Sequence, residues 1–142
     1  MKFSKIENIS LTDEMTWMNN IFITLDIDWC SDDVLANSID LLEKYDVSAT
    51  WFVTHETPLL ERLRENSKFE LGIHPNFNFL LNGEQNNGRT SEEVIDRLLE
   101  LVPDAKSVRS HSMTQSSVLL ELFKISSKQD SNLPRIGYRI LI

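Results

Sequence analysis

The sequence is poor in several features that mark common functional classes. Its 142 residues include one cysteine, Cys30, which excludes a disulfide framework and a zinc site built from cysteines alone. It has 4 glycines and neither a glycine-rich fingerprint after a strand nor a Gly-x-Ser-x-Gly motif, which disfavours a phosphate-cradling loop and an acyl-serine mechanism. No apolar run is long enough to span a membrane, and no basic segment precedes an apolar one as in a secretory signal. We therefore expect a soluble, cytoplasmic protein.

Basic residues are also in the minority. The chain has 14 Lys and Arg against 22 Asp and Glu, a net charge of −8. This balance repels phosphate backbones and anionic lipids, so we expect neither nucleic acid nor a membrane surface as a partner. With 41% hydrophobic residues the chain can bury a core, and its length fits one domain. We expect an irregular N-terminal segment (1–20), a barrel-like core (21–125) and an atypical tail (126–142).

Short apolar runs alternate with helix-forming segments along the chain. The runs predict four strands, over residues 21–27, 47–54, 69–73 and 106–109. Helices are predicted from capping signals at Ser31, Thr57 and Thr90 and, for the last, over residues 116–123. A polar loop rich in Asn and Gly is expected after the third strand, up to Arg89. This alternation predicts an α/β fold with a parallel sheet and right-handed crossovers.

Polar side chains follow each predicted strand at its carboxyl end. They are Asp26, Asp28 and Trp29; Thr54 and His55; His74, Pro75 and Asn76; and Arg109, Ser110, His111 and Ser112. All three histidines of the chain occupy such positions. Ligands of parallel α/β sheets bind at this end of the strands, so we expect a functional site there.

Asp26 and Asp28 form the first part of the expected site. Side chains two apart in a strand point to the same face, so the two carboxylates can share one site. Close carboxylates favour a shared cation or separated pKa values. One can bind a metal while the other acts as general base on water. The alternative is that Asp28 caps the following turn.

His74 is the expected imidazole ligand, because zinc and similar divalent ions prefer nitrogen and carboxylate oxygen together. Asn78 lies four residues on, where a second imidazole would complete a His-x-x-x-His pair. Its amide oxygen is a weak zinc ligand. His55 and His111 are alternatives for the third ligand or for proton transfer. Cys30 is either a soft ligand or a small loop residue.

The remaining candidates concern the substrate. Arg109 can hold Asp26 ionised and orient it, or clamp a substrate anion; a surface salt bridge is the alternative. Trp29, His55 and Phe77 are the expected substrate contacts, Phe77 because it lies in a loop. We expect most of the other aromatic side chains to be core.

Four segments together resemble the polysaccharide deacetylase family, also called the NodB-homology domain or carbohydrate esterase family four. Thr24-Leu25-Asp26-Ile27-Asp28 resembles its first motif in an Asp-x-Asp form, and His74-Pro75-Asn76-Phe77-Asn78 resembles its second. Arg109-Ser110-His111-Ser112 is similar to the third, and Ala49-Thr50-Trp51-Phe52-Val53 to the second strand. The residues found in these motifs resemble those of a divergent, WbmS-like subgroup of surface-polysaccharide deacetylases.

The resemblance implies part of an irregular seven-stranded (β/α) barrel, incomplete at the C-terminus. It implies that Asp26 is the catalytic base, that Asp28 and His74 bind the metal, and that Arg109 orients the base. Asn78 departs from the motif, and His111 or His55 would substitute for the general acid. The implied activity is metal-dependent removal of an acetyl group from an N- or O-acetylated sugar in surface-polysaccharide metabolism.

Two alternatives remain beside this reading. The first is a non-catalytic deacetylase-like domain that binds a saccharide or a protein partner. The second, a doubly wound phosphate-binding domain, is disfavoured by the missing glycine-rich loop. The tail ends on a strand-like stretch, residues 137–142, with no helix after it. We therefore expect an open sheet edge and a tendency to self-associate.

Overall fold

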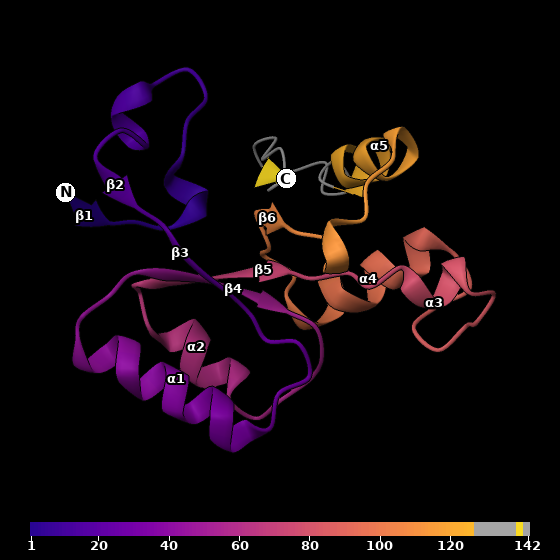
Figure 1. Ribbon diagram of the computed structural model, residues 1–142, viewed down its shortest axis with the longest axis horizontal. Coiled ribbons are helices and arrows are strands. Elements are labelled where there is room, and N and C mark those ends of the chain that lie inside the picture. Colours follow the sequence, from indigo (N-terminus) through magenta and orange to yellow (C-terminus); the bar gives the residue numbers. More distant parts are fainter. Residues whose placement is uncertain (127–138, 141–142) are drawn as a thin grey trace. The chain divides into compact units, whose positions relative to one another are not determined.

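The computed structural model describes residues 1–126 and 139–140 (Figure 1). The chain divides into two compact units, residues 1–71 and 72–142. A five-stranded sheet has the order β3-β4-β5-β6-β7, and β1 and β2 form a separate two-stranded sheet. β3 with β4, β5 with β6 and β6 with β7 run parallel. The predicted α/β class with a parallel sheet is confirmed.

The first unit begins with a segment that the sequence presents as irregular. β1 (Lys2–Phe3) pairs in parallel with β2 (Asn20–Ile21), and two 3-10 helices, η1 (Ile6–Asn8) and η2 (Glu14–Thr16), lie between them along the chain. Because Ile21 pairs with Phe3, the strand predicted over 21–27 begins later, at Ile23.

The central strands of this unit are β3 (Ile23–Asp26) and β4 (Ala49–Val53). Their register runs from Ile23 opposite Ala49 to Asp26 opposite Phe52. All five residues of β4 are buried, as expected for a parallel strand covered on both faces. β4 is therefore a rigid platform for whatever follows it.

Two helices accompany these strands, α1 (Asp32–Lys44) and α2 (Leu60–Glu65), which lie side by side in Figure 1. The Arg62 guanidinium joins them by donating to Asp40 Oδ1 (2.6 Å) and Glu43 Oε2 (2.5 Å). α2 begins three residues beyond the expected cap, Thr57. The Thr57 hydroxyl accepts from the Leu59 N–H (3.3 Å) and donates to Asp32 Oδ1 (2.5 Å).

The second unit takes in the end of β5 (Phe69–Ile73), which crosses the boundary between the units, together with β6 (Ser107–Val108) and β7 (Arg139–Ile140). Ile73 pairs with Val108, and Ser107 and Val108 pair with Arg139 and Ile140. β7 confirms a strand within the tail. Residues 127–138 and 141–142 of the tail lie outside the described residues, and self-association through an open edge stays a prediction.

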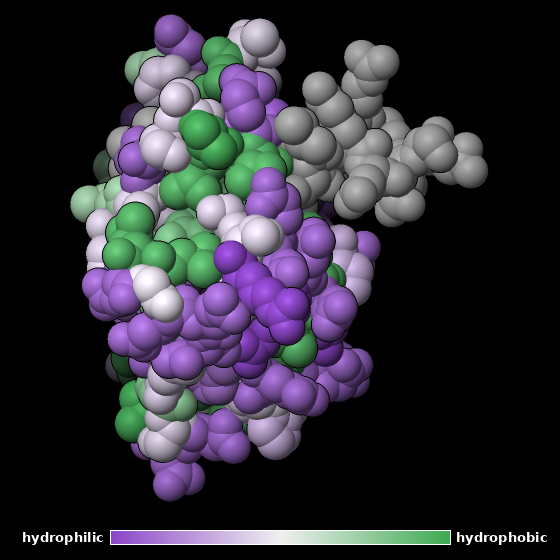
Figure 2. All heavy atoms as spheres, turned by 90° about the vertical axis from the view of Figure 1, so that its right-hand side faces the viewer, coloured by the Kyte–Doolittle hydropathy of each residue, from purple (hydrophilic) through white to green (hydrophobic). Residues whose placement is uncertain are grey.

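The helices of this unit are α3 (Asn78–Leu81), α4 (Ser91–Leu101), α5 (Ser117–Ser126) and a short 3-10 helix, η3 (His111–Met113). α4 starts as predicted, with Thr90 Oγ1 accepting from the Glu93 backbone N–H. α3 replaces part of the expected loop, because four residues are too few to show a helical period. The acidic residues of α4 are exposed. Figure 2 shows one face of the molecule, on which hydrophilic side chains cover much of the lower half.

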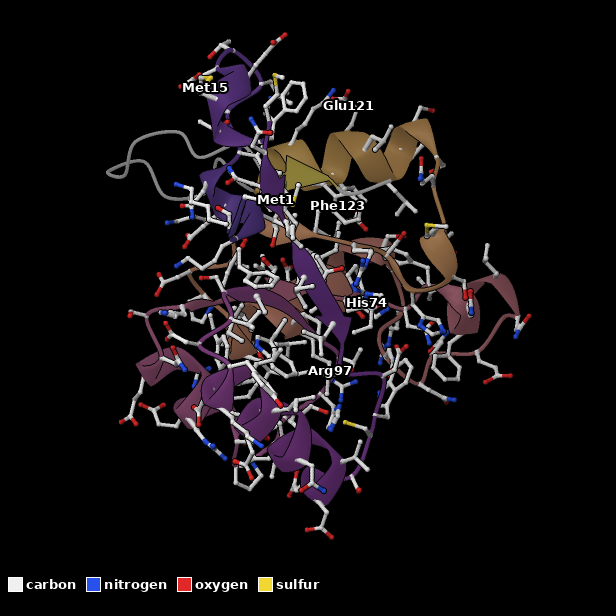
Figure 3. The ribbon with its side chains drawn as sticks, turned by 60° about the vertical axis from the view of Figure 1, so that its left-hand side comes forward. Met1, Met15, His74, Arg97, Glu121 and Phe123 are labelled. Carbon is white, nitrogen blue, oxygen red and sulfur yellow. The ribbon has the colours of Figure 1, made fainter. Side chains whose placement is uncertain are left out.

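Core residues of the second unit come from several elements. Phe123 points from α5 into the interior while Glu121 points away from it (Figure 3). Val94, Ile95 and Leu98 of α4 are also buried. Among the described residues, no helix combines the length and apolar character needed to cross a membrane.

Candidate metal centre

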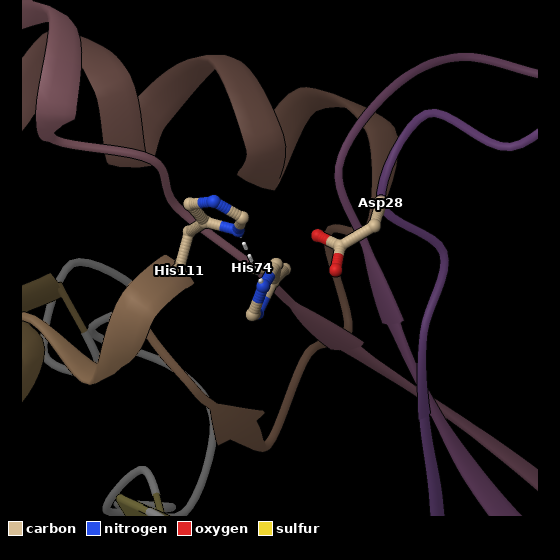
Figure 4. A group of neighbouring side chains, drawn as sticks. All are labelled: Asp28, His74 and His111. Carbon is tan, nitrogen blue, oxygen red and sulfur yellow. Dashed lines mark hydrogen bonds between the residues drawn. The ribbon is translucent and has the colours of Figure 1, made fainter.

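The second unit brings two histidines together at the ends of neighbouring strands. Backbone pairing continues past β5 and β6, since the Arg109 N–H donates to the Ile73 carbonyl (3.1 Å) and the His111 N–H to the Pro75 carbonyl (2.9 Å). This register places His74 beside His111. Their Nε2 and Nδ1 atoms are 3.3 Å apart, and their ring planes meet at 85° (Figure 4).

Local structure after β6 holds His111 in place. His111 opens η3, in which Ser112 and Met113 have positive φ values of 55° and 50°. The Ser110 hydroxyl donates to the Thr114 carbonyl (2.6 Å), and the Thr114 hydroxyl donates to the His111 carbonyl (3.2 Å). His111 is half-buried and His74 is 3% exposed, so His74 is the more enclosed imidazole.

Asp28 lies in a tight turn of the first unit and not in a strand. β3 ends at Asp26, and the Cys30 N–H donates to the Ile27 carbonyl (3.0 Å). Asp28 and Trp29 have φ values of 43° and 57°, which is the type I′ pattern. Strand alternation therefore does not explain how Asp26 and Asp28 would share a site, and that part of the sequence argument was wrong.

Asp28 of the first unit and His74 and His111 of the second are the candidate ligands (Figure 4). One carboxylate and two imidazoles are a donor set that suits zinc, and Zn–N bonds of about 2.1 Å at tetrahedral angles put two nitrogens roughly 3.4 Å apart. The 3.3 Å between the two histidines fits this spacing.

Asn78, the third ligand expected from motif spacing, has other partners. Its side-chain nitrogen is 3.4 Å from Ser112 Oγ, and its backbone N–H donates to Asn76 Oδ1 (2.9 Å) at the start of α3. His111, expected either as a third ligand or for proton transfer, lies beside His74 instead. The sequence predicts that Asn78 and His111 both lie near the site. It does not reveal the pairing of β5 with β6, which places His111 beside His74.

The chain is similar to a known protein family and to one solved structure. Residues 23–135 match the WbmS-like polysaccharide deacetylase family. The chain belongs to this family. It is also 50% identical to WbmS of Bordetella bronchiseptica, provisionally described as a polysaccharide deacetylase involved in O-antigen biosynthesis, whose solved structure it matches with a TM-score of 0.82. No curated protein is significantly similar to the chain.

The match to WbmS covers 88% of this chain and 51% of WbmS, so the chain spans about half the length of that protein. The polysaccharide deacetylase type of fold, expected from the sequence motifs, is confirmed by this likeness. Within the deacetylase family, each remaining residue expected at the site can now be placed.

Asp26 and Arg109 occupy the positions expected of them at strand ends. Asp26 is the last residue of β3 and its side chain is exposed. Arg109 directly follows β6 and is half-buried. Their catalytic roles stay predictions.

Trp29 and His55, expected to contact substrate, are linked through Thr54. The Thr54 hydroxyl oxygen accepts from the Trp29 backbone N–H (3.3 Å) and lies 2.9 Å from His55 Nδ1. Trp29 is 44% exposed and His55 is half-buried. Thr54 is the residue of this region to which the sequence assigned no role; its position directly after a buried strand was the available signal.

Phe77 is a core residue of the second unit. It is 2% exposed, and its ring centroid is 6.3 Å from that of Phe123. The expectation that Phe77 stacks on a sugar rested on its loop position, but this packing favours a structural role. We leave Phe77 out of the substrate contacts.

Phe77→Ala will lower the free energy of unfolding by about 3 kcal/mol, because it removes a buried aromatic side chain and leaves a cavity. Chemical denaturation measures the change. Phe79→Ala, at a half-buried position of α3, is the control and should cost less than half as much. Unchanged stability of Phe77→Ala together with lost saccharide binding would instead support the substrate role.

Cys30 is a poor candidate for a metal ligand. Burial raises the pKa of its thiol. A backbone hydrogen bond lowers this pKa in part, while the carboxylates of Asp32 and Asp28 raise it further. Cys30 is also not among the candidate ligands of the described residues, and a raised pKa makes a thiol less reactive.

Cys30 will therefore react with iodoacetamide more slowly than free cysteine at pH 8, and the rate will rise with pH as thiolate forms. Mass spectrometry of the alkylated chain follows the reaction. Cys30→Ser should leave zinc affinity within about twofold of wild type, a factor of two being about 0.4 kcal/mol. Rapid alkylation at neutral pH would contradict the raised pKa, and lost zinc affinity in Cys30→Ser would make Cys30 a ligand.

Proposed function

We propose that the chain carries the metal-binding and base residues of a hydrolase that removes an acetyl group from an N- or O-acetylated sugar in surface-polysaccharide metabolism. The observation that carries the proposal is the pair of imidazole nitrogens 3.3 Å apart at the ends of β5 and β6. Membership of the WbmS-like family supports the reaction class. The description of WbmS as involved in O-antigen biosynthesis supports the substrate class.

Asp28, His74 and His111 would hold the divalent ion, with zinc the ion that this donor set suits best. When bound, such an ion supplies Lewis acidity, which makes water a better nucleophile at neutral pH and polarises an acyl carbonyl. Three protein ligands leave room in a tetrahedral shell, which is the arrangement of catalytic zinc sites.

The chain's own residues would supply the proton transfers and the positioning. Asp26 would accept the proton of the attacking water as general base. Arg109, just past β6, would keep Asp26 ionised and oriented. The exposed Trp29 ring and His55 would contact the sugar, since an indole face can pack on the apolar side of a pyranose.

The test is release of acetate from acetylated saccharides by the purified chain. We expect release that depends on zinc, stops with a chelator and returns when zinc is added back. Zinc binding without acetate release, for any divalent ion, would contradict the enzymatic proposal. Saccharide binding under the same conditions would then favour a non-catalytic domain, for which Asn78 in place of a second imidazole is the supporting observation.

A further inference from the structure

The turn that carries Asp28 is conformationally costly. Asp28 and Trp29 are consecutive residues with left-handed backbone, at φ values of 43° and 57°. Asp tolerates this conformation, but the second position of a type I′ turn favours glycine, and a bulky residue there is an outlier. Such backbone persists where surrounding contacts over-determine it, and it occurs often at functional sites.

Two hydrogen bonds hold this turn. The Cys30 N–H closes it by donating to the Ile27 carbonyl (3.0 Å). The Trp29 N–H, at the strained position itself, donates to Thr54 Oγ1 (3.3 Å). The second bond reaches across 25 residues to the end of another strand, so it fixes the turn to the sheet and not merely to itself.

Thr54 is well placed to act as this anchor. It directly follows β4, where Trp51, Phe52 and Val53 are at most 1% exposed. Its hydroxyl also lies 2.9 Å from His55 Nδ1. One side chain therefore joins the Asp28–Trp29 turn, the end of a buried strand and the neighbouring histidine.

We infer that Thr54 is a positioning residue that preorganises Asp28 for metal binding, an inference that rests on the proposed function. Without the Thr54 hydroxyl, the Trp29 N–H loses this anchor, and the turn can relax toward backbone with negative φ. The Asp28 carboxylate would then be less well ordered before an ion arrives. Groups that orient ligands typically account for 10- to 100-fold in metal affinity.

The test compares Thr54→Val, which removes the hydroxyl at nearly constant shape, with Thr54→Ser, which keeps it. Zinc titration should show a dissociation constant about 10-fold higher for Thr54→Val, the lower end of the range for such groups. Thr54→Ser should stay near wild type. Thr57→Val is the matched control, because the buried Thr57 hydroxyl also makes two hydrogen bonds, to Asp32 and from the Leu59 N–H. It should lower thermal stability without changing zinc affinity.

A second readout follows the turn in metal-free protein. The chain has 3 tryptophans, of which Trp51 is 1% exposed, so a Trp17→Phe background leaves Trp29 as the exposed indole. Acrylamide should quench its fluorescence more strongly in Thr54→Val than in Thr54→Ser. Wild-type zinc affinity in Thr54→Val, or weaker affinity without a change in quenching, would overturn the positioning role alone. A wild-type chain that binds no zinc would overturn the proposed function, and this inference with it.

Discussion

Asp28→Asn will weaken zinc binding by on the order of 100-fold, equivalent to about 2.8 kcal/mol. The substitution removes the single carboxylate of the ligand group while keeping its size. Asparagine also tolerates the left-handed backbone found at this position, so the turn should persist. Competition with a chromophoric chelator measures the dissociation constant.

The matched control is Asp33→Asn, which removes one exposed carboxylate from the first turn of α1. It should leave zinc affinity within about twofold, because screening reduces the influence of an exposed charge that does not contact the ion. Equal effects of Asp28→Asn and Asp33→Asn would mean that only net charge matters and that Asp28 is not a ligand.

Asp26→Asn will lower the rate of acetate release by about 10²- to 10⁴-fold, the usual contribution of a positioned general base. Zinc affinity should stay close to wild type, because Asp26 is not in the ligand group. Steady-state kinetics and zinc titration of the same preparation separate the two properties. A fall in zinc affinity matching that of Asp28→Asn would show that Asp26 binds the metal instead.

Much of the sheet was predictable because buried parallel strands have a local signature. The predicted strands at 47–54 and 69–73 contain β4 and β5, which are rich in buried apolar residues. The pairing of Lys2–Phe3 with Asn20–Ile21 was not predictable, because two-residue strands carry no periodicity and depend on a partner distant in sequence. The start of α2 was misplaced because residues 58–59 form a turn before the helix begins at Leu60, although Thr57 Oγ1 accepts the Leu59 N–H as a cap does.

The candidate site was partly predictable for a related reason. Parallel strands bring their carboxyl ends to one edge, so His74 and His111 could be expected there from their positions alone. Choosing between Asn78 and His111 required the register of Ile73 with Val108, which no local pattern encodes. The strained Asp28–Trp29 turn was likewise not predictable, because Trp is not typical of a left-handed position.

The most direct test of the central claim is the X-ray absorption spectrum of zinc bound to the purified chain. Binding by His74, His111 and Asp28 predicts only nitrogen and oxygen neighbours at about 2.0–2.2 Å, with the outer-shell scattering of two imidazole rings. His111→Ala should remove the contribution of one ring. A sulfur neighbour at about 2.3 Å, or the absence of imidazole scattering, would contradict the account.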